Sequence, residues 1–311
     1  LVDEGEMENF APAWSPDGKA IAWGDERGVR IWNPSRGDVR VVSESPAVGR
    51  PAWSPDSTAI AFLDSQAQVL QALDIESGVM TPLATLHSAF YGAVRPPIMS
   101  RGGPAWSPDG SRIAFVCWDG YGDELCIVNA VGDSRQQLTT LGAAEERTGG
   151  SARSSVSGVA WSPDSTMLAV GVNAETRGAA SGVFRVALAS RTGQRLTSMT
   201  PNSPLIWEAA TNDLLVASSI DGRSDVYRLP SAGGDPASIT SALAEGAREP
   251  AIDEAGTLAV VSGRQIALLR PGSGEATYFE EAGLAAAAPA LSASGGLMAF
   301  LALPRPIERY P

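Results

Sequence analysis

The 311-residue sequence predicts an all-β protein, a ring of seven four-stranded antiparallel blades known as a β-propeller. One phrase recurs almost unchanged, as PAWSPDGKAIAW at 12–23, PAWSPDSTAIAF at 51–62 and PAWSPDGSRIAF at 104–115, with a fourth copy around Trp161. Weaker copies follow, centred on Trp207, Ile252 and Leu291. The intervals of roughly 40 to 55 residues are typical of one propeller blade per repeat. A ring of six or eight blades is the alternative if a weak copy is misjudged.

Each copy predicts a β-hairpin. In the third copy Pro108, Asp109 and Gly110 suit the second, third and fourth positions of a type I turn. The apolar run Ile113–Val116 that follows is continuous, as expected of a strand covered on both faces. Two further short strands can be placed after every copy except the last, so each repeat supplies a blade with strands A, B, C and D in chain order.

The repeated tryptophans, Trp14, Trp53, Trp106 and Trp161, are expected to pack between neighbouring blades, because a single blade cannot bury its own apolar faces. The last copy lacks outer strands, and residues 1–5 precede the first copy. We therefore expect the amino terminus to supply the outer strand of the seventh blade. The whole chain, 1–311, is expected to be a single domain taken from a longer protein.

The two cysteines flank a predicted hairpin loop. If residues 120–123 form a four-residue loop, Cys117 and Cys126 lie directly opposite each other, close enough for a disulfide. A disulfide would indicate an oxidising compartment. Two buried, unbonded thiols are the alternative.

Composition narrows the classes of partner. The net charge of −12 argues against nucleic acid and anionic lipid, which require clustered Lys and Arg. The sequence has no run of eighteen apolar residues, so we expect no membrane insertion by this chain.

The phrase W-S-P-D-G-x-x-I-A-F, with a later Asp-Gly and a Leu-Thr, resembles the PD40 (WD40-like) repeats of TolB-type β-propellers. DGYGDELCIVNAVGDSRQQLT at 119–139 and DGRSDVYRLPSAGGDPASIT at 221–240 carry that second half. The resemblance implies a bacterial scaffold or sensor of the periplasm or another extracytoplasmic space. A tether, if there is one, is expected in a segment upstream of the chain. The resemblance also implies a protein or ligand partner. The chain is similar, too, to the propeller that gates prolyl-oligopeptidase-type enzymes.

Nothing in the sequence indicates catalysis. The G-x-S-x-G motif of serine hydrolases is absent, and His87 is the one histidine. With Cys117 and Cys126, His87 would give a zinc site at most three ligands. The acidic stretch at 119–124 departs from the spacing of a calcium loop. We expect a non-enzymatic protein without a metal or cofactor.

Blade topology predicts where a partner binds. The A–B and C–D turns share one face, and the B–C and D–A connections share the other. The long connections 87–103, 142–157, 119–123 and 173–181 belong to blades 2 to 4 and should converge on that second face.

Aromatic and arginine residues on these loops are the types that dominate binding hot spots. The expected binding residues are His87, Phe90, Tyr91, Arg95, Trp118, Tyr121 and Arg147. The alternative role of the first loop is to seal the mouth of the channel. A protein is the expected partner. Two other functions remain open: the gating propeller of a serine peptidase whose catalytic domain is absent, and a glycan-binding propeller that uses Trp118, Tyr121 or Tyr91.

Overall fold

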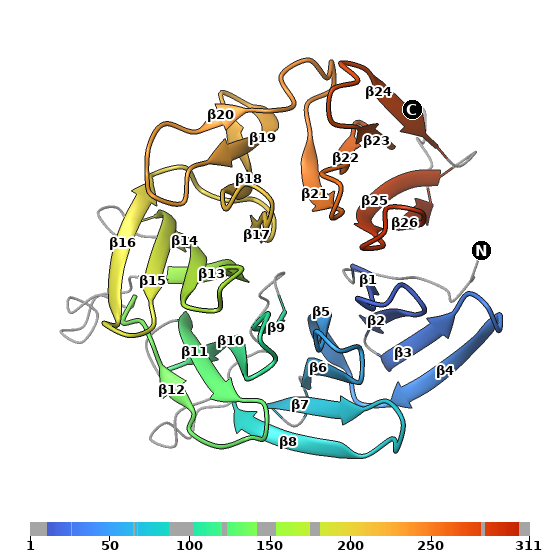
Figure 1. Ribbon diagram of the computed structural model, residues 1–311, viewed down its shortest axis with the longest axis vertical. Coiled ribbons are helices and arrows are strands. Elements are labelled where there is room, and N and C mark those ends of the chain that lie inside the picture. Colours follow the sequence, from blue (N-terminus) through green and yellow to red (C-terminus); the bar gives the residue numbers. More distant parts are fainter. Residues whose placement is uncertain are drawn as a thin grey trace, which may run out of the picture.

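The strands of the computed structural model form sheets that surround a common axis (Figure 1). The structure describes residues 11–25, 27–64, 66, 68–86, 103–119, 123–141, 154–174, 181–280 and 284–304. Within this part of the chain, six sheets have four antiparallel strands each, paired in chain order, and a further sheet has two. The predicted four-stranded antiparallel propeller blade is thus confirmed.

The first three blades occupy the amino-terminal half of the chain. Their strands are β1 (Ala13–Trp14), β2 (Ile21–Asp25), β3 (Gly28–Asn33) and β4 (Asp38–Ser43) in blade 1; β5 (Ala47–Trp53), β6 (Ala59–Asp64), β7 (Val69–Asp74) and β8 (Met80–Thr85) in blade 2; and β9 (Ala105–Trp106), β10 (Arg112–Trp118), β11 (Asp123–Asn129) and β12 (Gln136–Gln137) in blade 3.

The remaining sheets complete the circle. Their strands are β13 (Ser154–Trp161), β14 (Met167–Ala174), β15 (Gly182–Ala187) and β16 (Thr192–Thr197) in blade 4; β17 (Ile206–Trp207), β18 (Leu214–Ile220), β19 (Arg223–Leu229) and β20 (Ala237–Ser238) in blade 5; β21 (Arg248–Ile252), β22 (Leu258–Ser262), β23 (Gln265–Leu269) and β24 (Ala276–Phe279) in blade 6; and the pair β25 (Leu284–Leu291) and β26 (Met298–Pro304).

The number of complete blades differs from the main prediction. The described residues form six four-stranded blades, the alternative number, and not seven. The seventh repeat does fold, but it contributes only β25 and β26. Residues 305–311 and the amino-terminal strand predicted at 1–5 lie outside the described residues. The seventh repeat therefore has the inner half of a blade, placed between blade 6 and blade 1.

Three of the four repeated tryptophans form hydrogen bonds to the preceding repeat, in line with their predicted packing between blades. The indole N–H of Trp53 donates to the carbonyl of Ala13 in the preceding blade, at 3.0 Å, and Trp161 makes the equivalent bond to Ala105 at 2.9 Å. Trp14 donates to the carbonyl of Ala290 in β25, at 3.2 Å. The last of these bonds joins the first repeat to the seventh and closes the ring.

The core is continuous across blades 2 to 4. One cluster of buried residues draws on β6, β10 and β14, with Leu63, Phe115 and Val170 each almost completely buried. The predicted run Ile113–Val116 lies in β10 and is fully buried, as a central strand between two covered faces should be. Blade 3 therefore shares its buried core with both neighbouring blades.

Candidate functional site

Most of the predicted binding patch lies outside the described residues. Only Trp118 of its seven residues is placed by the structure. Trp118 ends β10, is half-buried, and packs against the core of blades 2 to 4. Its backbone N–H donates to the carbonyl of Leu86 at 2.8 Å, which ties blade 3 to blade 2 at this end. The residues not placed are His87, Phe90, Tyr91, Arg95, Tyr121 and Arg147.

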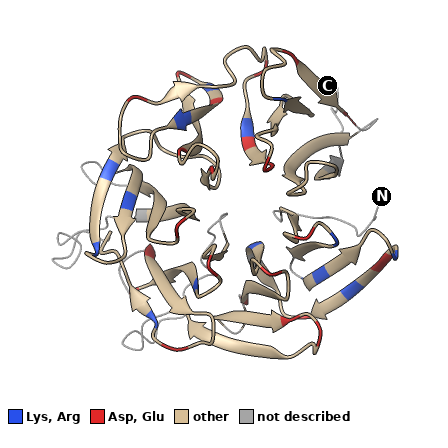
Figure 2. Ribbon diagram, viewed as in Figure 1, with Lys and Arg blue, Asp and Glu red and all other residues tan. Residues whose placement is uncertain are grey.

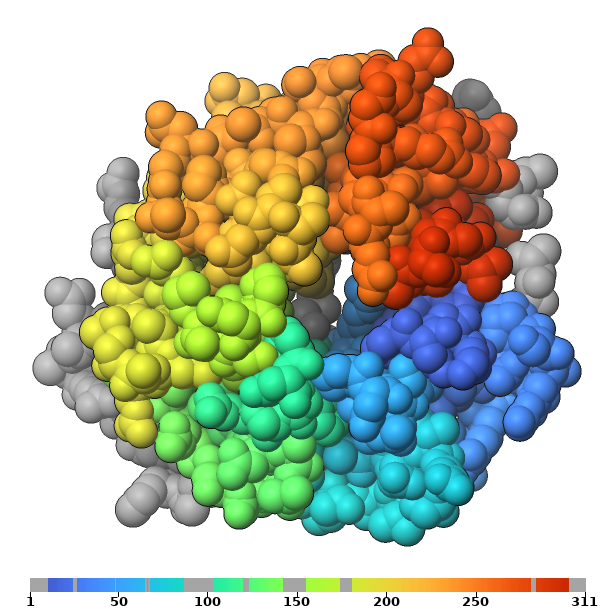
Figure 3. All heavy atoms as spheres, in the orientation of Figure 1, coloured from blue at the N-terminus to red at the C-terminus, as the bar shows by residue number. Residues whose placement is uncertain are grey.

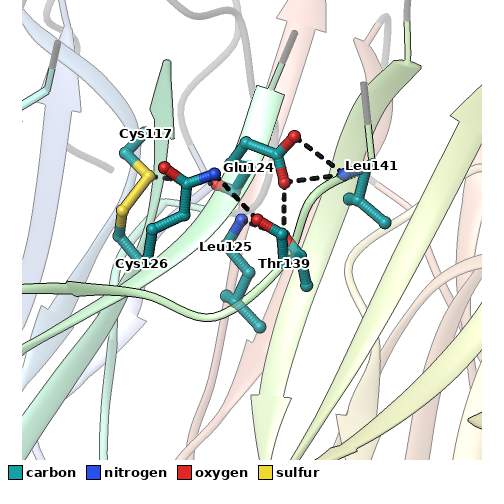
Figure 4. Close-up of a disulfide and its surroundings, with 7 residues drawn as sticks. Cys117, Glu124, Leu125, Cys126, Thr139 and Leu141 are labelled. Atoms are coloured by element: carbon teal, nitrogen blue, oxygen red, sulfur yellow. Dashed lines mark hydrogen bonds between the residues drawn. A yellow bond between two sulfur atoms is a disulfide. The ribbon is translucent and has the colours of Figure 1, made fainter. Parts of the chain in front are cut away.

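The two cysteines are joined by a disulfide (Figure 4), and Cys117 directly precedes Trp118 in β10. Both residues are fully buried, and their Cα atoms are 5.8 Å apart. We expected the two cysteines to lie directly opposite each other, and this register was wrong. Cys117 faces Glu124 and Cys126 faces Phe115, so the disulfide joins a diagonal pair. The predicted loop was placed one residue too late, because β10 and β11 pair up to Trp118 and leave 119–122 as the connection.

A buried carboxylate, Glu124, lies beside the disulfide (Figure 4). It accepts a hydrogen bond from the hydroxyl of Thr139 at 2.6 Å and two from the N–H of Leu141, at 2.8 and 2.9 Å. In blade 5 the hydroxyl of Thr240 likewise donates to buried Asp225, at 3.0 Å. The acid and the threonine of the repeat's second half therefore attach the outer strand to the blade, a structural use that sequence reasoning missed.

The serine-proline-aspartate turns form a closed hydrogen-bond unit. In blade 3 the Ser107 hydroxyl donates to the Asp109 carboxylate at 2.5 Å, and the N–H of Ser111 donates to the same carboxylate at 3.0 Å. The N–H of Arg112 donates back to the Ser107 hydroxyl oxygen at 3.0 Å. The hydrogen bond from Ser107 holds the pKa of Asp109 below its ordinary value, although partial burial opposes this. These turns are compact and have little freedom to move.

Serine at the last position of the turn adds a bond between blades. The N–H of Asp17 donates to the Ser57 hydroxyl oxygen in the next blade, and the N–H of Asp109 donates to Ser165, both at 3.1 Å. Ser57 and Ser165 adopt positive φ angles, 62° and 59°. Blade 3 has Gly110 at this position, which offers no hydroxyl to the aspartate N–H of blade 2. The junction between blades 2 and 3 therefore lacks this bond.

The same junction lacks the tryptophan bond and is hollow. The indole N–H of Trp106 is buried and has no hydrogen-bond partner among the residues that the structure describes. A groove of about 310 Å³ lies here, lined by Asp56, Trp106, Asp109, Gly110 and neighbouring turn residues. Two carboxylates and an unpaired indole donor thus border an opening on the face that carries the A–B turns.

A second groove lies on the other side of blade 3, between blades 3 and 4. Its volume is about 510 Å³, and polar side chains line much of it, among them Asn129, Ser134 and Gln136. Arg112, which is half-buried, and Arg191, which is exposed, add two guanidinium groups. This groove can accept hydrogen-bonding and acidic groups of a partner.

Sequence reasoning placed the binding surface on the opposite face, because the A–B turns are compact. The grooves that the described residues form lie on the face of the A–B turns, one on each side of blade 3, and most of the predicted loop-face patch lies outside the described residues. The four near-identical copies differ at the last turn position, where the first and third have Gly18 and Gly110 and the second and fourth have Ser57 and Ser165.

Among the described residues, no cluster of three or more His, Cys, Asp or Glu side chains has the proximity that a metal site needs. Nor does the described part of the chain include a helix with the length and apolar character to cross a membrane.

Comparison with known proteins extends this picture. The family model of the lipoprotein LpqB beta-propeller domain matches residues 1–252. No curated protein matches the chain.

Solved structures share the fold at low sequence identity. TolB from Acinetobacter baumannii is 16% identical, with a TM-score of 0.53, and the match covers 94% of this chain but 63% of that one. A putative TolB from Agrobacterium tumefaciens is also 16% identical, with a TM-score of 0.57 and coverage of 88% and 89%. A Mycobacterium tuberculosis puromycin-hydrolyzing peptidase is 18% identical, with a TM-score of 0.62 and coverage of 96% of this chain and 49% of that chain. The chain spans less than two thirds of the first and third of these proteins.

Proposed function

Because the chain belongs to the family of the lipoprotein LpqB β-propeller domain, we propose that it is a non-catalytic binding propeller that acts outside the cytoplasm. In this proposal it is one propeller domain of a longer protein, and it binds a protein partner around blade 3. The observation that carries the proposal is the pair of grooves flanking this blade on one face.

Three features support the setting and the kind of partner. The disulfide between Cys117 and Cys126 suits an oxidising compartment. The net charge of −12 disfavours nucleic acid. The rigid core of blades 2 to 4 fixes the groove walls, so that little ordering entropy is lost when a partner binds.

The partner can occupy either face of blades 2 to 4, and the two faces make different predictions. On the turn face, Arg112 and Arg191 are the anchors of the larger groove. On the loop face, the anchors are the seven residues predicted from the sequence, of which Trp118 has a described position.

The experiment uses a photoreactive amino acid introduced at turn-face and loop-face positions of the full-length protein in its native envelope. The cross-linked partner is identified by mass spectrometry, purified, and its affinity for alanine variants measured. The double variant Arg112→Ala with Arg191→Ala is expected to weaken binding at least about tenfold, as anchor residues do. Arg36→Ala, an exposed arginine on blade 1, is the matched control. Unchanged affinity for both the turn-face and the loop-face variants contradicts the proposal.

A second candidate is the propeller of a serine peptidase. The similarity to the puromycin-hydrolyzing peptidase, of whose chain this one covers 49%, favours it. Here the chain would control access to a hydrolase domain encoded in the same gene. Sequencing the complete gene tests this candidate: a G-x-S-x-G hydrolase domain supports it, and a complete gene without one contradicts it. The glycan-binding alternative receives no support from the described residues beyond the half-buried position of Trp118.

We also propose that β25 and β26 are the inner half of a seventh blade that the amino terminus completes. The bond from Trp14 to Ala290 supports this, because it places the first repeat against β25. Deletion of residues 1–8 is expected to lower the melting temperature; an unchanged temperature contradicts the proposal.

A further inference from the structure

The innermost strands of the ring border an opening on the axis (Figure 3). Seven strands take this position: β1, β5, β9, β13, β17, β21 and β25. Only two of them carry charged residues, Arg50 on β5 and the pair Arg248 and Glu249 on β21. Figure 2 shows the basic segment of β5 at the inner edge of its blade.

The two charged strands differ in how their charges are satisfied. On β21, Glu249 accepts the N–H of Ala288 at 2.6 Å and lies 3.9 Å from the guanidinium of Arg248. Arg248 also donates to the carbonyl of Gly263 at 3.3 Å. On β5, the Arg50 guanidinium has neither a hydrogen bond nor an ion pair in the described part of the chain.

Neighbouring residues leave Arg50 without a partner. The backbone of Gly103 in blade 3 lies so close that a Cβ there would overlap the Arg50 carbonyl. Arg50 stands three residues before the tryptophan of its repeat, a position that is small or apolar in five of the other repeats. Those residues are Ala11, Gly103, Gly158, Pro204 and Ala288. Only Glu249 of blade 6 is polar there, and its carboxylate is already engaged.

Arg50 is both crowded by protein and partly reached by water. Its surface is partly accessible to water, yet burial lowers the pKa of its guanidinium to about 10. The partial exposure and the lowered pKa are consistent with a side chain that protein surrounds closely and that solvent reaches along the axis. With that pKa the group stays protonated at neutral pH, and no described residue supplies a counter-ion for this partly desolvated positive charge.

We propose that Arg50 anchors an oxyanion-binding site in the axial opening, which accepts a carboxylate or phosphate group. A guanidinium presents its donors in a planar fork that matches either group with two hydrogen bonds. In a protein of net charge −12, a cation on an innermost strand that has no partner among the described residues is a specific feature. The site does not depend on where a protein partner docks.

The experiment observes Arg50 directly. The Nε–H signals of the arginines are recorded by NMR in the intact chain, and the Arg50 signal is assigned with Arg50→Lys. Inorganic phosphate, acetate and chloride are added separately at equal ionic strength. A short peptide, with its carboxyl terminus free or amidated, distinguishes a chain end from a free anion. We expect a saturable shift of the Arg50 signal with phosphate or a carboxylate but not with chloride, and no shift of exposed Arg36.

Thermal unfolding provides the second measurement. At a phosphate concentration well above the dissociation constant, the melting temperature of the wild type and of Arg36→Gln should rise by about 2 to 4 °C. Arg50→Met should show no such rise, and without added anion it should melt at or above the wild-type temperature, because an uncompensated charge has been removed. Absence of a saturable Arg50 shift overturns the proposal, and so does an equal phosphate response in Arg50→Met.

Discussion

Substitution of the serine at the last turn position tests the hydrogen bond that joins blades 3 and 4. Ser165→Ala removes the acceptor of the Asp109 N–H, a bond of 3.1 Å, and should cost about 1 to 1.5 kcal/mol. Ser165→Gly loses the same bond, but it relieves the positive φ of 59°, which costs a residue with a Cβ about 1 kcal/mol. The glycine variant should therefore be close to the wild type and about 1 kcal/mol more stable than the alanine variant.

The converse change can be made in the next junction. Gly110 has φ 72°, and a Cβ built there approaches only Pro55, at 3.9 Å, so a side chain fits. Gly110→Ser and Gly110→Ala carry the same backbone cost, but only the serine offers an acceptor to the N–H of Asp56. We expect Gly110→Ser to be about 1 kcal/mol more stable than Gly110→Ala.

The four variants are compared by urea unfolding at pH 7, followed by circular dichroism, with the wild type measured in parallel. The two pairs share one backbone geometry, so the comparison within each pair isolates the hydroxyl or the strain. Equal stability of Ser165→Ala and Ser165→Gly refutes the explanation based on strain. Equal stability of Gly110→Ser and Gly110→Ala shows that the hydroxyl does not join the blades.

Three further outcomes are expected. Trp14→Phe should lose about 1 kcal/mol of stability in urea because its bond to the seventh repeat is lost, whereas Trp106→Phe, whose N–H has no partner, should lose less; the reverse order contradicts the assigned roles. Replacing Cys117 and Cys126 together by serine should cost about 2 to 3 kcal/mol, measured by thermal unfolding, and a reducing agent should then have no further effect on the variant. A hydrogen bond from Ser162 lowers the folded-state pKa of Asp164, so the stabilisation by this carboxylate is present above pH ~3.9 and disappears as the pH falls through the folded pKa. In thermal unfolding from pH 6 to 2, the difference in melting temperature between the wild type and Asp164→Asn should shrink toward the acid end. A difference independent of pH would be inconsistent with this.

The sequence predicted well the features that depend on adjacent residues, namely the turns and the order of strands within a blade. The turn at Pro108, Asp109 and Gly110 forms with the N–H of Gly110 donating to Ser107 at 2.9 Å, because its geometry depends on four adjacent residues. The order of strands within each blade followed from the same local signals.

Features that depend on register or on several blades were not predictable. The pairing of Cys117 and Cys126 is diagonal, since a shift of one residue in the hairpin loop changes which residues face each other. The groove beside Trp106 lies at a junction where two bonds are missing among the described residues, and the repeats reveal this only once the bonds at other junctions are known. The isolation of Arg50 depends on side chains from seven strands that are distant in the sequence.

The closure of the ring between the first and seventh repeats is tested most directly by a nuclear Overhauser experiment on the Trp14 indole N–H. Since this group donates to the Ala290 carbonyl at 3.2 Å, cross-peaks from its proton to protons of residues 290 and 291 are expected. Cross-peaks confined to residues of the first repeat would contradict a closed ring.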